Sequence, residues 1–227
     1  ASYTVGLTGF TKVLGVDDPE IVAYSKTTSQ TAAMSALSMY LVLDKSGSMA
    51  EPVKAGSSRT RYDAVQESAM TFARDVGKLD SDGIDVVLFS GAGIVSHTGV
   101  TADTVKAIFA ENQPRGGTPL AEALTEALKL AGKSDKKDFI VVFTDGEPDD
   151  KAAAAKVIID AANRQETDDA LTILFIQVGD DAGATNYLRS LDDGLSGAKF
   201  DIVDAKTVAE ADAFATTADL IVAAIAD

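Results

Sequence analysis

Cysteine is absent from the 227 residues of the chain, and His97 is its single histidine. Without cysteine there can be no disulfide framework, zinc–thiolate site or cysteine nucleophile, and one histidine cannot form a histidine-rich metal site. No apolar stretch approaches the roughly 18 residues that are needed to span a bilayer. The chain begins with Ala1 rather than methionine, and no signal-like segment follows, so we expect a processed or trimmed form.

Basic residues are also scarce. The chain has 20 Lys and Arg against 35 Asp and Glu, which gives a net charge of −15 and an isoelectric point near 4.4. The densest basic stretch, residues 133–137, carries its own aspartate and is typical of a solvated loop. Phosphate repulsion therefore disfavours nucleic-acid binding, whereas divalent cations would be attracted.

Apolar residues are plentiful: they make up 46% of the chain, enough for one substantial core. From residue 38 onward, strand-like and helix-like segments alternate. We expect parallel strands at residues 38–43, 84–89, 139–143, 171–178 and 200–203, and a short edge strand at residues 93–97. The alternation predicts an α/β fold with a doubly wound, Rossmann-like sheet, mostly parallel with one short antiparallel edge strand, and helices on both faces.

Between the strands, apolar residues recur at spacings of three and four, which predicts helices that pack one face on the sheet. The predicted core faces are Tyr62, Val65, Ala69, Phe72 and Val76; Leu120, Leu124, Ala127 and Leu128; and Ala155, Ile158, Ile159 and Ala162. A final helix over about residues 206–225 is expected to bury Val208, Phe214, Ala218, Ile221, Val222 and Ile225.

The first 37 residues differ from the rest. Residues 3–13 show strand-like alternation, and residues 25–31 are polar and typical of a linker. We therefore divide the chain into an N-terminal extension and linker at residues 1–37 and one α/β domain at residues 38–227.

Oxygen-bearing side chains gather where two predicted strands end. Asp44 ends the first core strand and is followed by Ser46 and Ser48, while Asp145 follows the third predicted strand. Thr118 lies between them, after a flexible glycine pair. The carboxyl ends of parallel strands meet at one edge of a sheet, and a hard divalent cation takes oxygen ligands. The pattern predicts a cation site; the alternative is that these residues only form turns and helix caps.

This set resembles the metal-ion-dependent adhesion site of the von Willebrand factor type A domain, over roughly residues 38–226. The resemblance implies Mg²⁺ (or Mn²⁺ or Ca²⁺), bound directly by Ser46, Ser48 and Thr118, with Asp44 and Asp145 in the outer shell. It also implies a protein partner whose Asp or Glu carboxylate completes the octahedron. Gly117 and Glu147 are then expected beside that ligand, and the last helix is expected to shift when the ligand binds.

Segments such as residues 62–67 and 143–149 resemble bacterial members of the family. The N-terminal residues 1–15 resemble the membrane-proximal part of Tad (Flp) pilus-assembly proteins of the TadE/TadG type. This implies a metal-dependent adhesion or adaptor module in pilus assembly or at the cell surface, in the bacterial envelope, with the anchor missing from this chain. The alternative is a cytoplasmic adaptor that works with a chaperone ATPase or a stress-response system.

An enzyme is the competing class of function. Acidic strand ends with Mg²⁺ also suit a phosphohydrolase, but a haloacid-dehalogenase-type enzyme would need Asp-x-Asp where this chain has Asp44 and Ser46. Serines that bind a metal are poor nucleophiles, and no histidine or lysine lies in the matching motifs to activate them. We therefore expect no catalytic residues. A structural pilus component with an inactive metal site is a third hypothesis.

Overall fold

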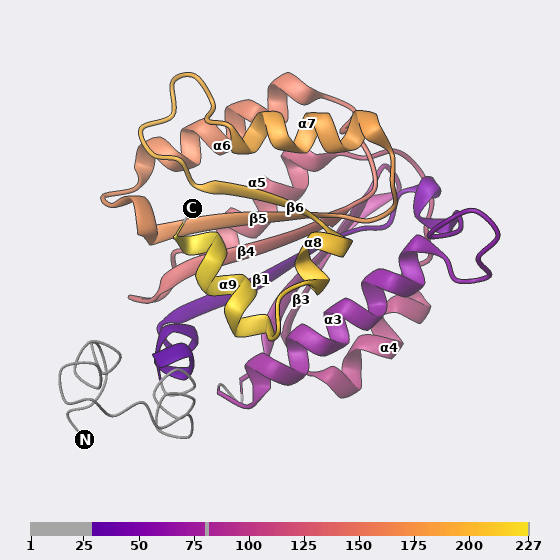
Figure 1. Cartoon of the computed structure of the whole chain (residues 1–227), viewed down its shortest axis with the longest axis horizontal. Helices are drawn as coiled ribbons and strands as arrows, with labels where there is room; N and C mark the ends of the chain where they lie inside the picture. The colour runs from indigo at the N-terminus through magenta and orange to yellow at the C-terminus, as the bar shows by residue number, and fades with distance from the viewer. Residues whose placement is uncertain (1–28, 80–81, 227) are drawn as a thin grey trace, which may run out of the picture.

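The computed structural model describes residues 29–79 and 82–226, and its centre is a sheet of six strands with helices on both faces (Figure 1). The strands are β1 (Leu37–Asp44), β2 (Ile84–Ser90), β3 (Gly93–Val100), β4 (Lys137–Thr144), β5 (Leu171–Gln177) and β6 (Val203–Thr207). All neighbours pair in parallel except β2 and β3, which are antiparallel. The predicted α/β fold class is confirmed.

The strand order, β3-β2-β1-β4-β5-β6, reverses beside β1. The chain builds outward from β1 to β2 and β3, then returns to place β4, β5 and β6 on the other side. In an open parallel sheet, this switch point opens a crevice beyond the carboxyl ends of the strands. The loops that follow β1 and β4 therefore become neighbours, although about 100 residues separate them in sequence, as in the Thr144–Asp44 contact.

The two edge strands differ from the prediction. The antiparallel edge strand β3 has 8 residues, as many as β1, rather than being short. At the other edge, β6 starts at Val203, where the predicted strand of residues 200–203 ends. Ile202 is buried ahead of this strand, and its carbonyl accepts a hydrogen bond from Ile173 N–H at 2.7 Å. The apolar side chain of Ile202 therefore packs in the core, although the residue lies in the connection before β6.

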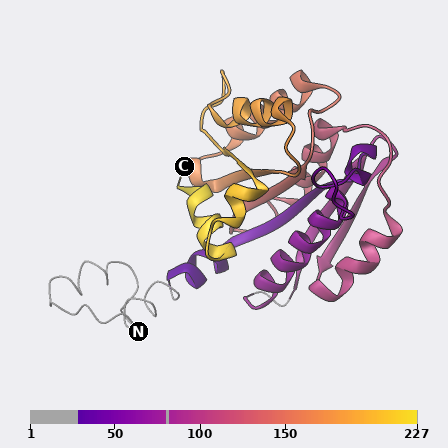
Figure 2. The ribbon, with the colours of Figure 1, turned by 45° about the vertical axis from the view of Figure 1, so that its right-hand side comes forward.

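Helices cover both faces of the sheet, as Figures 1 and 2 show. One face carries α3 (Arg61–Gly77), α4 (Ala102–Glu111), α8 (Val208–Asp212) and α9 (Thr217–Ile225); the other carries α5 (Leu120–Leu130), α6 (Lys151–Arg164) and α7 (Ala182–Asp192). The predicted core face of α3 is buried throughout, and α5 buries its predicted residues apart from the half-buried Leu128. On α6, Ile158 and Ala162 are buried as predicted, but Ala154 and Ala161 replace Ala155 and Ile159.

The single final helix predicted from the sequence is wrong, because the structure has two short helices, α8 and α9. Thr207 caps α8 through a reciprocal capping box with Glu210, and Thr216 caps α9 by accepting the Asp219 N–H at 3.0 Å. The second cap starts a new helix and so interrupts the expected one. On α9, Ile221 is buried as predicted, whereas Val222 is 39% exposed.

The predicted N-terminal strand, residues 3–13, lies outside the described residues. Residues 29–35, which include the end of the predicted linker, are helical and lead into β1. Gln30 Nε2 donates to Asp219 Oδ1 of α9 at 2.5 Å, and Met34 is buried in the core. Within the described parts of the chain, no helix combines the length and the apolar character needed to cross a membrane.

Candidate metal centre

Asp44, the last residue of β1, is fully buried. Its Oδ1 accepts the backbone N–H of Ser46 at 2.7 Å, and its Oδ2 accepts the Thr144 hydroxyl at 2.7 Å. Burial raises the pKa of this carboxyl to about 6, although hydrogen bonds from Ser46 and Thr144 oppose the rise. In the described structure, Asp44 is in none of the direct ion pairs, so its negative charge is solvated only by neutral donors.

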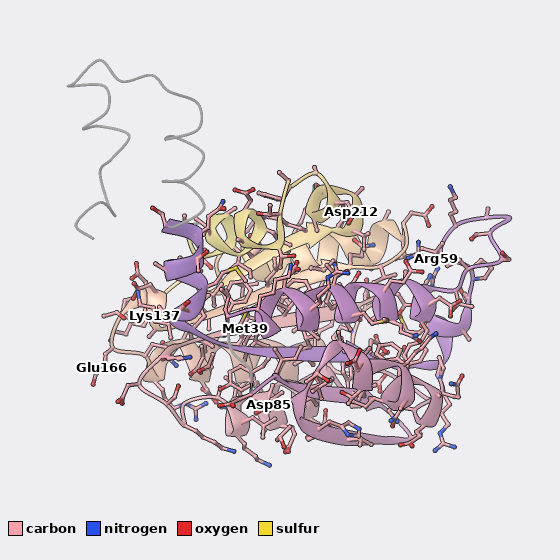
Figure 3. All side chains as sticks on the ribbon, turned by 90° about the horizontal axis from the view of Figure 1, so that it is seen from below. Met39, Arg59, Asp85, Lys137, Glu166 and Asp212 are labelled. Atoms are coloured by element: carbon pink, nitrogen blue, oxygen red, sulfur yellow. The ribbon has the colours of Figure 1, made fainter. Side chains whose placement is uncertain are left out.

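The two serines place their hydroxyls beside a second carboxylate. The short turn η1 (Gly47–Ala50) brings Ser48 Oγ to 3.2 Å from Ser46 Oγ. Ser48 Oγ also donates to Asp145 Oδ1 at 3.0 Å, across 97 positions in sequence. Ser46 and Asp145 are buried and Ser48 is half-buried. Three oxygens from the loops after β1 and β4 thus converge at the carboxyl ends of the strands. In Figure 3, Arg59 lies at this end of the sheet, and Lys137 and Glu166 lie at the opposite end.

The loop of Thr118 is joined to the serine loop through its glycines. Gly47 N–H donates to the Gly116 carbonyl at 2.9 Å, and Arg115 N–H donates to the Lys45 carbonyl at 2.8 Å. Gly116 has φ +82°, and a Cβ there would lie 2.9 Å from Ala92 N, so only glycine fits. These bonds hold the buried Thr118 beside the loop that carries Ser46 and Ser48.

Asp149 fixes the backbone of Thr118. Thr118 N–H donates to Asp149 Oδ2, and Asp149 N–H donates back to the Thr118 carbonyl, both at 3.0 Å. A Cβ on Gly117 would lie 2.6 Å from Asp149 Oδ2, so the carboxylate fills the space that this glycine leaves. The helix cap belongs to Asp150, which accepts Ala153 N–H at 2.8 Å. Asp149 therefore positions the threonine loop, a role that the sequence did not indicate.

Arg61 is the second residue that sequence reasoning missed. Its Nη1 lies 2.8 Å from Asp145 Oδ2, 3.4 Å from the Ser48 carbonyl and 3.2 Å from Glu51 Oε2. Asp145 is thus shared between a serine hydroxyl on one oxygen and a guanidinium on the other. The contact spans 84 positions, and no local pattern could have revealed it.

Glu147, predicted beside the ligand, is exposed and pairs with Lys151 one helical turn later, with 2.5 Å between Oε2 and Nζ. It lies two residues beyond Asp145, on the same loop. The structure therefore places the predicted site residues at the end of β1 and on three adjacent loops, and side-chain contacts join Ser46, Ser48 and Asp145.

The profile of the von Willebrand factor type A domain matches residues 39–147, from β1 through the loop that follows β4. This segment contains every residue of the predicted cation site. Over these residues, the chain matches the von Willebrand factor type A family. The resemblance seen in the sequence is thereby confirmed.

Solved structures share the fold of this von Willebrand factor A domain at low identity. A mutant of the PilB minor pilin from Streptococcus sanguinis is 14% identical with a TM-score of 0.57, over 84% of this chain and 60% of the pilin. Manganese-loaded TRAP from Plasmodium vivax is 16% identical with a TM-score of 0.53, over 78% of this chain and 71% of that one. The SpaC pilus adhesin of Lactobacillus rhamnosus GG is 18% identical with a TM-score of 0.50, over 84% and 30%.

These identities establish the fold alone, and the chain spans only part of the pilin and the adhesin. No curated protein matches the chain in sequence.

The donors of this von Willebrand factor A domain suit a hard divalent cation. Among the described residues, no group of three or more His, Cys, Asp or Glu side chains is placed to hold a metal ion. The groups that converge are three side-chain oxygens, Ser46 Oγ, Ser48 Oγ and Asp145 Oδ1. The buried carboxylate of Asp44, which makes no direct ion pair in the described structure, lies next to Ser46. Such a set fits Mg²⁺ or Mn²⁺.

Proposed function

We propose that this domain is a protein-binding module that depends on a divalent cation. Ser46, Ser48 and Thr118 would hold Mg²⁺ or Mn²⁺ directly, and Asp44 and Asp145 would act from the outer shell. The observation that carries the proposal is the convergence of the two serine hydroxyls, 3.2 Å apart, with Ser48 Oγ also 3.0 Å from the carboxylate of Asp145.

The proposed direct ligands are neutral hydroxyls, so a bound ion would keep most of its charge and attract an oxygen anion. A carboxylate from Asp or Glu of a partner protein has the required charge and hardness. Gly117 and the exposed Glu147 lie on the loops that flank the serines and would border the partner's side chain. The threonine loop, held by Asp149, would set the distance between Thr118 and the ion.

We propose that the cation centre binds a partner rather than catalyses a reaction. The single histidine, His97, lies on the edge strand β3, separated from the β1 loop by β2. The serines would be occupied as ligands, and Ser46 stands where a second aspartate would be needed for phosphoryl transfer. A nucleophile with an adjacent base is therefore missing from the described centre.

The adhesin, the pilin and the manganese-loaded protein of similar fold agree with a module of this kind. We propose that the domain acts at the bacterial surface or in the cell envelope, in adhesion or pilus assembly. A cytoplasmic adaptor would use the same centre, so this proposal concerns location and partner rather than chemistry.

Peptides provide a test that does not require the partner to be known. An array of peptides that present Asp or Glu, each matched by an Asn or Gln version, is probed in Mg²⁺ and in EDTA. Binding should require both the carboxylate and Mg²⁺, because the ion bridges the two molecules. Ser46→Ala should lose it by removing a proposed ligand.

Ser90→Ala is the matched control, since Ser90 is equally buried at the end of the adjacent strand β2 but lies outside the oxygen set. It should bind like the wild type. Undiminished binding in EDTA, or by Ser46→Ala, would refute the proposed function.

A further inference from the structure

The proposed centre contains a positively charged side chain of the protein itself, the guanidinium of Arg61. Arg61 Nη1 is 2.8 Å from Asp145 Oδ2, and the two side chains are only 16% and 2% exposed. The same nitrogen faces the Ser48 carbonyl at 3.4 Å. Asp145 thus contacts Ser48 Oγ through one oxygen and the guanidinium through the other, so an ion bound to Ser48 Oγ would share this carboxylate with Arg61. Two positive charges that face one carboxylate repel each other even in a polar environment.

The position of Arg61 is unfavourable for local stability. Arg61 is the first residue of α3, where the helix dipole favours negative charge. The helix is capped independently by Thr60 and Asp63, which exchange hydrogen bonds. In addition, Arg61 Nε is buried without a hydrogen-bond partner, which carries a desolvation cost. Capping thus gives no reason for a positive charge here. Of the two carboxylates that the charge contacts, Asp145 is buried, whereas Glu51 is exposed to solvent.

The charge balance of the centre shows what Arg61 would change. Asp44 and Asp145 together carry two negative charges, which a divalent cation would neutralise completely. The ion would still attract an anion at its open position, but the net charge of the centre would add nothing to that attraction. Arg61 also contacts Glu51, but that carboxylate is 62% exposed, so water screens it. Among the buried groups, including Arg61 leaves the loaded centre with one positive charge, which a single carboxylate brings to neutrality.

We propose that Arg61 sets the balance between metal affinity and ligand affinity: it weakens the binding of the divalent cation and keeps the loaded centre positive for a carboxylate. This inference rests on the proposed function of the centre. It assigns Arg61 as a positioning and specificity residue that acts through Asp145 rather than as a metal ligand.

The first test is calorimetric titration of Mg²⁺ into the wild type, Arg61→Met and Arg61→Lys. Arg61→Met keeps the aliphatic stem and removes the charge, so Mg²⁺ should bind about tenfold more tightly than to the wild type. Arg61→Lys keeps the charge and should stay close to the wild type. Unchanged or weaker Mg²⁺ binding by Arg61→Met would overturn the proposal.

Arg61→Gln serves as a second neutral variant in case Arg61→Met does not fold, and thermal unfolding in EDTA shows whether each variant is native. Either neutral variant that is native decides the first test.

The second test uses acetate as the carboxylate probe. The Mg²⁺ titration is repeated in sodium acetate and in sodium chloride at equal ionic strength, corrected for Mg²⁺ that acetate binds in solution. By reciprocal linkage, acetate that binds the loaded centre raises its apparent Mg²⁺ affinity. The increase should appear in the wild type and Arg61→Lys and shrink or vanish in Arg61→Met. Equal increases in all three would overturn the proposal.

Ser46→Ala separates failure of this inference from failure of the proposed function. If Ser46→Ala still binds Mg²⁺ like the wild type, the cation centre itself is wrong. If Ser46→Ala loses Mg²⁺ while Arg61→Met behaves like the wild type, the centre stands and the role of Arg61 is wrong.

Discussion

Replacing Asp44 by asparagine should stabilise the cation-free protein, although it removes a residue of the proposed centre. The Asp44 carboxyl is fully buried, and burial raises its pKa from 3.8 to about 6. Each pKa unit is worth about 1.4 kcal/mol, so the ionised side chain costs the folded state about 3 kcal/mol near neutral pH. Asparagine is of similar size and carries no charge.

The hydrogen bonds of Asp44 can be largely kept in this variant. The asparagine oxygen can accept the Ser46 N–H, and its amide can donate to Thr144 Oγ1. The Thr144 hydroxyl must then donate elsewhere, and the Gly146 carbonyl lies 3.5 Å away. Since that contact is long, we expect a net gain of about 1–3 kcal/mol rather than the full amount.

The cost of the buried Asp44 charge depends on pH. The folded pKa of Asp44 lies above its unfolded value, so the penalty is absent below about pH 4, grows as the pH rises, and is complete above about pH 6. Urea unfolding in EDTA should show Asp44→Asn more stable than the wild type near neutral pH, with the difference vanishing near pH 4. A variant that is less stable than the wild type near neutral pH would refute the reasoning.

Two further substitutions test the packing around the centre and at the C-terminus. Gly117→Ala should weaken Mg²⁺ binding and cost about 1 kcal/mol in urea unfolding, because its Cβ displaces Asp149 from Thr118 N–H; with Asp149→Ala the two costs should not add. Ile221→Ala should cost about 2–4 kcal/mol because Ile221 is fully buried, whereas Val222→Ala should change stability by less than about 1 kcal/mol. Similar costs for the two α9 variants, or additive costs at Gly117 and Asp149, would contradict this packing.

Much of the fold could be predicted because the inner strands are continuous apolar runs bounded by polar residues. The run that ends at Asp44 is an example, and β2, β4 and β5 are found in the same way. Two of the four core positions predicted for the alanine-rich helix α6 are wrong, because small alanines give little contrast between its faces. The helices α4 and α7 were not predicted, although Val105, Ile108 and Phe109 repeat at helical spacing.

The carboxylates and hydroxyls of the site could be found because each follows a recognisable strand or glycine pair. Arg61 and Asp149 could not, since their roles arise from contacts across 84 and 31 positions. The split of the last helix had a local signal in Thr216 and Asp219, which was outweighed by the apolar spacing around it. The division at residue 37 and the roles of the site residues as ligands stay predictions.

Calorimetric titration of Mg²⁺ into the wild type beside Ser46→Ala tests the central claim most directly. Ser46 Oγ lies 3.2 Å from Ser48 Oγ, so its removal deletes one of the three converging oxygens and leaves the rest in place. We predict saturable binding by the wild type and its loss in Ser46→Ala, with Ser90→Ala unchanged. Equal Mg²⁺ binding by the wild type and Ser46→Ala, or none by the wild type, would contradict the account.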